Sequence, residues 1–292
     1  MRINEWDVLQ LLKNKLIDAA ETKGLKLNDS DFGSKRWNAS EKRVFYLWRL
    51  ENNLFERPSP STVLGTGAEA VRSSAAMIFN LLGEKDIILD NKKYSGAEYE
   101  KTFPAIIDST GDPHDAHLDA VFISKDETEM YAVEAKLLEW NDSPKNLAQA
   151  YLNKELYLCP NECDVFVHFF NSLINQELDG DGRFKHKTKR YDAIQMTIHT
   201  LGLYNHFAGI KTPQVNKLTL QNVVWKYDSD EYETEEIEAI QYLNEANKVF
   251  APLFKEIGID YSIRYSTFQD FKKRIDFSND SSRLEYLKRY EV

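Results

Sequence analysis

The sequence predicts an α/β protein in which a mixed β-sheet core is flanked by helices, with a helical addition before the core and an α/β addition after it. Three observations predict this class. Segments with apolar residues at helical spacing alternate with short apolar runs of strand length. A polar turn joins two such runs between residues 117 and 137. The chain has 292 residues, of which 42% are hydrophobic and 12% aromatic, enough to fill a sizeable core.

The first 60 residues are expected to form a helical extension. WDVLQLLKNKLIDAA (residues 6–20) and SEKRVFYLWRLENNLF (residues 40–55) both carry apolar residues at helical spacing. The stretch ERPSPST then breaks the pattern because it is rich in proline and serine. We therefore assign residues 1–60 to the extension, residues 61–227 to the core, and residues 228–292 to a C-terminal extension packed on the core.

The first half of the core is expected to follow the order helix, strand, strand, strand, helix, strand. A helix of small residues ends at Gly83, and Ser143 and Pro144 are typical of a helix start. The expected elements are a helix at 68–83, strands at 98–107 and on both sides of the turn within 117–137, a helix at 144–158, and a buried strand at 163–170 (CDVFVHFF).

The second half begins with RFKHKTKR, residues 183–190, which we call the basic segment. The pattern that follows indicates further alternation of helices and strands. The expected elements are a helix at 192–210, a strand at 217–227, a long helix at 234–257 interrupted at Pro252, and a strand at 259–266 before a short final helix.

The hairpin carries an unusual pair of acids. Side chains alternate between the two faces of a strand, so Glu134 and Lys136 point the same way. If the turn is centred on Asp126 and Glu127, the numbers of paired residues sum to 253, and Asp119 lies opposite Glu134. Like charges in that position destabilise an antiparallel pair. Because a hard divalent cation held by carboxylate oxygens would neutralise both acids, the pattern predicts a metal site.

The acids belong to a recognisable motif: Asp119 is followed, after 14 residues, by Glu134, Ala135 and Lys136. In its predicted helix and strand context, this motif resembles the PD-(D/E)XK nuclease superfamily and its restriction-endonuclease-like fold, over about residues 61–170. The resemblance implies that Asp119 and Glu134 bind Mg²⁺, for which Mn²⁺ can substitute, and that the carbonyl of Ala135 is a further ligand. It implies that Lys136 positions or activates the attacking water.

Two more residues enter through the resemblance, and two positions depart from it. An acid on the preceding helix often contributes to the site, and Glu69 is the best match. Gln149 lies on the helix expected to approach the site. However, Leu118 replaces the proline of the family name, and Asn153 stands where the Gln-x-x-x-Tyr signature of RecB-like members requires tyrosine. These departures leave the subfamily open.

The charge distribution bears on the partner. A net charge of -10 argues mildly against nucleic acid, but the basic segment places five basic residues and a histidine within eight positions. We assign nucleic-acid binding to Lys185, Lys187, Lys189 and Arg190, although a solvated loop is the alternative. The expected function is therefore a Mg²⁺-dependent phosphodiesterase, an endo- or exodeoxyribonuclease acting in restriction, defence or repair. DNA is the expected partner, and a homodimer is left open.

Two other functions remain in view. The first is a nucleic-acid-binding module that keeps the fold without cleaving, and the second is a metal-dependent hydrolase of a small phosphorylated substrate. The sequence shows no apolar run typical of a signal peptide or a membrane span. Cys159 and Cys163 form neither a disulfide framework nor a four-ligand zinc pattern. We therefore expect a cytoplasmic protein without a membrane partner.

Overall fold

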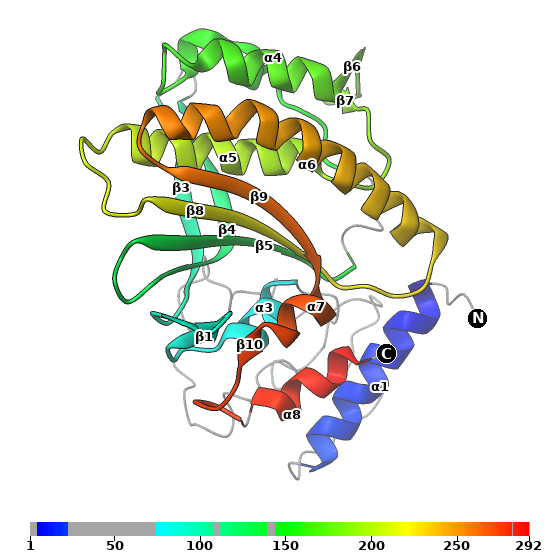
Figure 1. Cartoon of the computed structure of the whole chain (residues 1–292). Helices are drawn as coiled ribbons and strands as arrows, with labels where there is room; N and C mark the ends of the chain where they lie inside the picture. Colours follow the sequence, from blue (N-terminus) through cyan, green and yellow to red (C-terminus); the bar gives the residue numbers. More distant parts are fainter. Residues whose placement is uncertain (1–4, 23–73, 108–110, 139–143, 282, 292) are drawn as a thin grey trace.

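The centre of the molecule is a mixed sheet of five strands in the order β3-β4-β5-β8-β9 (Figure 1). The computed structural model describes residues 5–22, 74–107, 111–138, 144–281 and 283–291. The strands are β3 (Glu98–Ile107), β4 (Pro113–Ile123), β5 (Glu129–Lys136), β8 (Lys217–Val224) and β9 (Asp260–Thr267). The first three are antiparallel, whereas β8 runs parallel to β5 and β9 runs parallel to β8.

Helices cover both faces of this sheet, which confirms the predicted α/β class (Figure 1). One face carries α4 (Cys163–Leu173), α5 (Ala193–Ala208) and α6 (Asp230–Glu256). The other face carries α1 (Glu5–Thr22), α3 (Ser74–Leu82), α7 (Phe268–Lys273) and α8 (Arg283–Leu287). Buried apolar side chains form one core on each side, which we call the α5-side core and the α3-side core.

Smaller elements lie around these layers. A three-stranded sheet in the order β10-β1-β2 packs into the α3-side core, and β6 and β7 form a separate hairpin. These elements are β1 (Ile87–Leu89), β2 (Lys92–Tyr94), β6 (Ile174–Leu178), β7 (Phe184–His186), β10 (Ile275–Asp276), and the 3₁₀ turns η5 (Gln149–Leu152), η6 (Lys154–Leu156) and η7 (Lys288–Tyr290).

Several expected elements are confirmed. They are the first helix, the end of the helix at Gly83, strand β3, the β4–β5 hairpin, helix α5, and strands β8 and β9. Gly83 has a φ of +66° and its N–H donates to the carbonyl of Phe79 at 2.8 Å. A left-handed residue at this position closes a helix, and glycine adopts it without a steric cost.

The segment CDVFVHFF is a helix, so the predicted strand is wrong. Phe166, Phe169, Phe170 and Leu173 follow one another at intervals of three, one and three residues, and all four are buried on one side of α4. This spacing is that of a helical face. The dense apolar run had favoured a buried strand, but apolar content alone does not distinguish the two.

The helix predicted for residues 144–158 is also wrong. Two short 3₁₀ turns occupy part of this stretch, and the side chain of Asn153 accepts from the N–H of Glu155 between them. Before them, the backbone groups of Leu147 and Phe184 form two hydrogen bonds of 2.9 Å with each other. Because Leu147 takes a partner distant in sequence, the helix cannot start there. The helix and strand that complete the core order are α5 and β8.

Helix α6 runs through Pro252 without interruption, contrary to prediction. Proline lacks an N–H and costs a helix one hydrogen bond. Here Phe250, Leu253 and Phe254 are buried in the α5-side core on both sides of Pro252, and this packing holds the last turns. The predicted helix at residues 40–55 and the break at ERPSPST lie outside the described residues.

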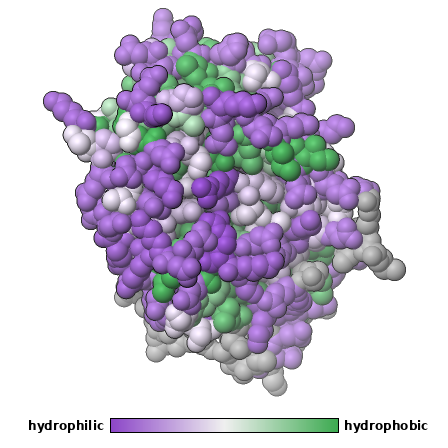
Figure 2. Space-filling model, viewed as in Figure 1, coloured by the Kyte–Doolittle hydropathy of each residue, from purple (hydrophilic) through white to green (hydrophobic). Residues whose placement is uncertain are grey.

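Most side chains on the face shown in Figure 2 are hydrophilic, and hydrophobic ones gather over the first half of α6. Ile237 and Ile240 are exposed on this helix. Among the described residues, no helix is both long enough and apolar enough to cross a membrane.

Candidate active site

The β4–β5 hairpin has the predicted register. Ala120 pairs with Val133 and Phe122 pairs with Tyr131, and the residue numbers of each pair sum to 253. The pairing ends at Ala120 and Val133, so the predicted pair of Asp119 and Glu134 lies one step beyond the paired residues. The turn is held by Asp126, whose carboxylate accepts from the backbone N–H of Thr128 at 3.2 Å and from its hydroxyl at 2.8 Å.

The side chains of β4 stop alternating regularly between the two faces of the sheet at Asp119. Leu118 belongs to the α5-side core and Ala120 to the α3-side core, although residues two apart in a regular strand share a face. The neighbouring residue on β3 is Glu100, whose φ of +51° is rare for a residue with a side chain. At this irregularity the Asp119 carboxylate reaches across to β5, where Oδ2 accepts from the N–H of Ala135 at 2.6 Å.

Glu134 is the centre of a buried hydrogen-bond network. Its Oε1 accepts from Nζ of Lys136 and from Nε2 of Gln195, both at 2.8 Å. Its Oε2 accepts from Nε2 of His199 at 3.0 Å. Lys136 also donates to Oε1 of Gln195 at 2.7 Å. Gln195 and His199 lie one turn apart on α5, so this helix orients both the acid and the lysine of the motif.

The three acids of this region differ in their electrostatics. Burial favours protonation of Glu134, but the charges of Lys136 and His199 outweigh it and lower the pKa of Glu134. Burial, and then the negative charge of Glu134, raise the pKa of Asp119 well above its ordinary value. The same two causes raise the pKa of Glu100. Glu134 therefore has positive partners, whereas Asp119 favours its protonated form.

The donors present fit a hard divalent cation. Asp119 and Glu134 offer carboxylate oxygens. Burial, and then the negative charge of Glu134, raise the pKa of Asp119, and a cation would compensate that negative charge. Among the described side chains, no three of His, Cys, Asp or Glu come together as a potential metal centre. A third protein ligand would therefore be a backbone oxygen, and the Ala135 carbonyl is the one expected from the sequence.

The structure does not bring all the expected residues together. Gln149 lies in η5, where its exposed amide donates to the carbonyl of Gly182 at 2.8 Å. Glu69 lies outside the described residues. Gln195 and His199, which sequence reasoning missed, contact Glu134 instead. Their spacing of four residues in a correctly predicted helix was the available signal, because it places both side chains on one face of that helix.

The basic segment lies on the surface of the molecule and includes strand β7. Lys185, Lys187 and Lys189 are exposed and alternate with His186 and Thr188, which turn inward. The ammonium of Lys185 lies 3.1 Å from a carboxylate oxygen of Glu177, and that of Lys187 donates to the carbonyl of Ser172 at 2.7 Å. The three lysines thus follow one exposed edge, as expected for a surface that contacts a large anion.

Comparison with protein-family models, with curated proteins and with solved structures found no significant match to this chain. The functional argument therefore depends on the geometry of these residues.

Proposed function

We propose that this protein is a metal-dependent nuclease that hydrolyses phosphodiester bonds of DNA, with a catalytic centre of the PD-(D/E)XK type. One observation carries the proposal. The Asp119 carboxylate accepts from the N–H of Ala135, the residue after Glu134, and Lys136 contacts Glu134 at 2.8 Å. Two acids and a lysine are what hydrolysis of a phosphodiester needs, because the reaction gathers negative charge on phosphate and requires an oriented water.

Several of the protein's own residues would have separate roles in this hydrolysis. The Lys136 ammonium, only 19% exposed, is a cation that can orient a water molecule and stabilise charge on the phosphate. Gln195 limits the positions of that ammonium because its amide binds both Lys136 and Glu134. His199 fixes the carboxylate of Glu134 from the other side. Mg²⁺, or Mn²⁺ in its place, held by Asp119, Glu134 and the Ala135 carbonyl would supply further positive charge at the scissile phosphate.

The basic segment supports DNA as the substrate. A centre with several acids repels a polyanion, so an approach surface needs cations of its own. Lys185, Lys187, Lys189 and Arg190 form such a surface on a stretch whose main chain is held in place by hydrogen bonds. Contacts of this kind bind phosphates without reading sequence.

The test is cleavage of plasmid and single-stranded DNA with and without Mg²⁺. We expect the wild-type protein to cleave only with the metal. Asp119→Asn, Glu134→Gln and Lys136→Ala should each lower the rate by ~100-fold or more, which is the usual effect of removing a group that acts on the transition state. Glu155→Gln and Lys255→Ala remove exposed charges elsewhere and should cleave at the wild-type rate.

Circular dichroism and thermal unfolding should show that the variants are folded, since Glu134 is buried. A wild-type protein that leaves all these substrates intact in Mg²⁺ and Mn²⁺ would refute the proposal. So would a folded Asp119→Asn variant with the full rate.

A further inference from the structure

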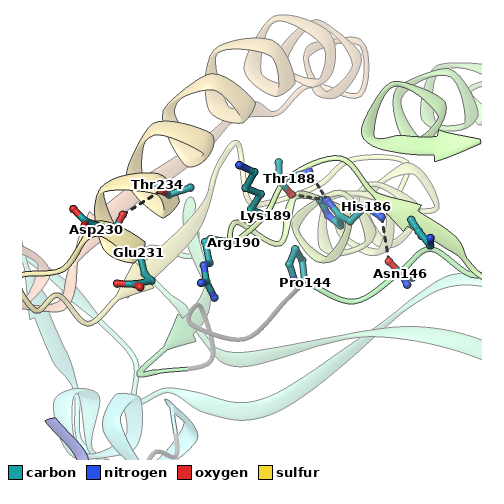
Figure 3. A pocket seen from close by; sticks show the side chains of 10 residues that line it. Pro144, Asn146, His186, Thr188, Lys189, Arg190, Asp230, Glu231 and Thr234 are labelled. Atoms are coloured by element: carbon teal, nitrogen blue, oxygen red, sulfur yellow. Dashed lines mark hydrogen bonds between the residues drawn. The ribbon is translucent and has the colours of Figure 1, made fainter. Parts of the chain in front are cut away.

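A cleft of about 590 Å³ separates the basic segment from the start of α6 (Figure 3). One wall carries Lys189 and Arg190, and the opposite wall carries Asp230 and Glu231. Cavities that bind small molecules commonly have a volume of roughly 300–1,000 Å³. The size and the two charged walls make this cleft a candidate binding site.

The cationic wall is rigidly built. The carboxylate of Glu238, on the third turn of α6, accepts from three successive backbone N–H groups: Lys189 at 2.8 Å, Arg190 at 2.9 Å and Tyr191 at 3.0 Å. Beneath them, the buried ring of His186 accepts from the N–H of Ile194 through Nε2 at 3.3 Å. A wall whose backbone is fixed in this way loses little conformational entropy when a ligand binds. The alternative of a flexible solvated loop does not fit these contacts.

Lys189 on one wall and Glu231 on the other do not neutralise each other. In the part of the chain that the structure describes, the side chains of Lys189 and Glu231 make no hydrogen bond or ion pair. A cleft with a cation on one side and a carboxylate on the other suits a ligand with an anionic end and a hydrogen-bond-donating end. A nucleotide within a DNA strand has both, because its phosphate is anionic and the N–H groups of its base are donors.

We propose that this cleft binds one nucleotide, with its phosphate on Lys189 and Arg190 and with base N–H groups donating to the Glu231 carboxylate. The inference rests on the proposed function for the class of ligand and deepens it, since the bound unit is one nucleotide of the strand being cut. Neither wall includes Asp119, Glu134 or Lys136.

The cleft lies close to the catalytic hairpin. Glu235 directly follows Thr234, which lines the cleft, and Glu235 itself is buried. The positive charges of Lys136 and Arg190 both act on the pKa of Glu235, opposing the effect of burial. The lysine of the catalytic motif and the arginine of the cleft therefore lie within electrostatic reach of the same carboxyl group. A strand with one nucleotide in the cleft would pass near the catalytic centre.

Calorimetric titration with adenosine 5′-monophosphate, adenosine and inorganic phosphate, all in EDTA, tests this inference without cleavage. We expect the wild-type protein to bind the nucleotide more tightly than either fragment. Lys189→Ala combined with Arg190→Ala should weaken nucleotide and phosphate binding ~10-fold or more, as expected when charge-assisted hydrogen bonds are lost. Glu231→Ala should weaken nucleotide and adenosine binding but not phosphate binding.

Lys187→Ala is the matched control, because this lysine contacts the carbonyl of Ser172 and does not line the cleft. Its affinity for the nucleotide should equal that of the wild-type protein. Nucleotide binding no tighter than phosphate binding, or none at millimolar concentration, would overturn the inference, as would an unchanged affinity in the Lys189 and Arg190 double variant. Binding as expected in a protein that cleaves no DNA would instead refute the nuclease proposal and leave the cleft assignment standing.

Discussion

Glu235 is an acid enclosed by the protein. It is 2% exposed, and its Oε2 has no hydrogen-bond partner among the described residues. Burial and the charge of Glu238 raise the pKa of Glu235 to about 8, despite the opposing charges of Lys136 and Arg190. Asp192 adds further negative charge. At neutral pH the protonated form of this side chain therefore predominates.

This acid should make stability depend on pH. Because the pKa of Glu235 is about 8 when folded and 4.5 ordinarily, its stabilisation is complete below pH 4.5 and is lost as the pH rises towards 8. The loss is about 1.4 kcal/mol per pH unit in that window. Glu235→Gln should remove this slope, as measured by urea unfolding between pH 5 and 8.

Asp119 contributes a decline of the same sign, so the comparison is between the slopes of wild type and variant. Glu245→Gln, on the exposed side of α6, should retain the wild-type slope. Equal slopes in wild type and Glu235→Gln would show that the Glu235 carboxyl is ionised throughout this range.

Single residues of the site could be predicted only where they interrupt the apolar pattern of a strand. Asp119, Glu134 and Lys136 interrupt apolar strands that a short turn joins, so counting residues from the turn predicted the register of the two strands. Glu100 could not be found in this way, because a left-handed residue inside a strand has no local sequence signal when it is not glycine.

Among the elements, α5 carries the side chains that contact Glu134 and Lys136. Gly202 is the point where this helix meets the sheet: a Cβ atom there would lie 2.8 Å from the carbonyl oxygen of Phe103 and 2.8 Å from the Cβ of Ala116. The absence of a side chain allows the close approach. Gln195 and His199, on the preceding turns of the same helix, thereby reach Glu134 on β5.

Gly202→Ala should destabilise the protein. Alanine favours a helix over glycine by about 1 kcal/mol, but the overlap with strand atoms should cost about 1–3 kcal/mol and reverse the sign. Gly209→Ala is the matched control, because the nearest atoms to its added Cβ are at 3.8 Å. Urea unfolding of both variants measures the difference. A Gly202→Ala protein as stable as the wild type would mean that α5 can move away from the sheet at no cost.

Elements with a complete local pattern were predictable from sequence, and those decided by distant partners were not. Helix α5 has both the apolar spacing and the Asp192 cap, whose side chain accepts from the N–H of Gln195 at 2.9 Å. By contrast, Leu147 pairs with Phe184, 37 positions away, and no local sequence pattern indicates that pairing.

Across the whole molecule, charge is unevenly distributed. The chain has a net charge of -10, and the basic segment is its densest positive stretch. The lysines of this segment are not equivalent, because Lys185 and Lys187 have partners in Glu177 and Ser172. Among the three lysines of this segment, Lys189 is the one whose side chain makes no hydrogen bond or ion pair within the part of the chain that the structure describes.

Replacing Lys185, Lys187, Lys189 and Arg190 together by alanine should weaken DNA binding for all sequences and flatten its salt dependence. Each lost phosphate contact reduces the slope of log affinity against log salt by about 0.9 for duplex DNA. Fluorescence anisotropy in EDTA at several salt concentrations measures both quantities. Replacing only Lys189 and Arg190 should weaken DNA binding more than replacing only Lys185 and Lys187. An unaltered affinity and slope in the fourfold variant would show that these residues are merely solvated.

The sheet order itself was beyond sequence reasoning. Strand β9 lies beyond the long helix α6 and pairs in parallel with β8 along its full length, from Lys217 with Asp260 to Val224 with Thr267. The apolar pattern predicted the strand, but parallel pairing across an intervening helix is a property of the assembled layers.

The contact between Glu238 and the basic segment also matters for protein engineering. Glu238 holds main-chain N–H groups, so the path of residues 189–191 does not depend on which side chains they carry. Any amino acid except proline can supply the N–H at these positions. Libraries that vary positions 189 and 190 would therefore sample new ligand preferences on an unchanged backbone, with the β4–β5 hairpin left unaltered.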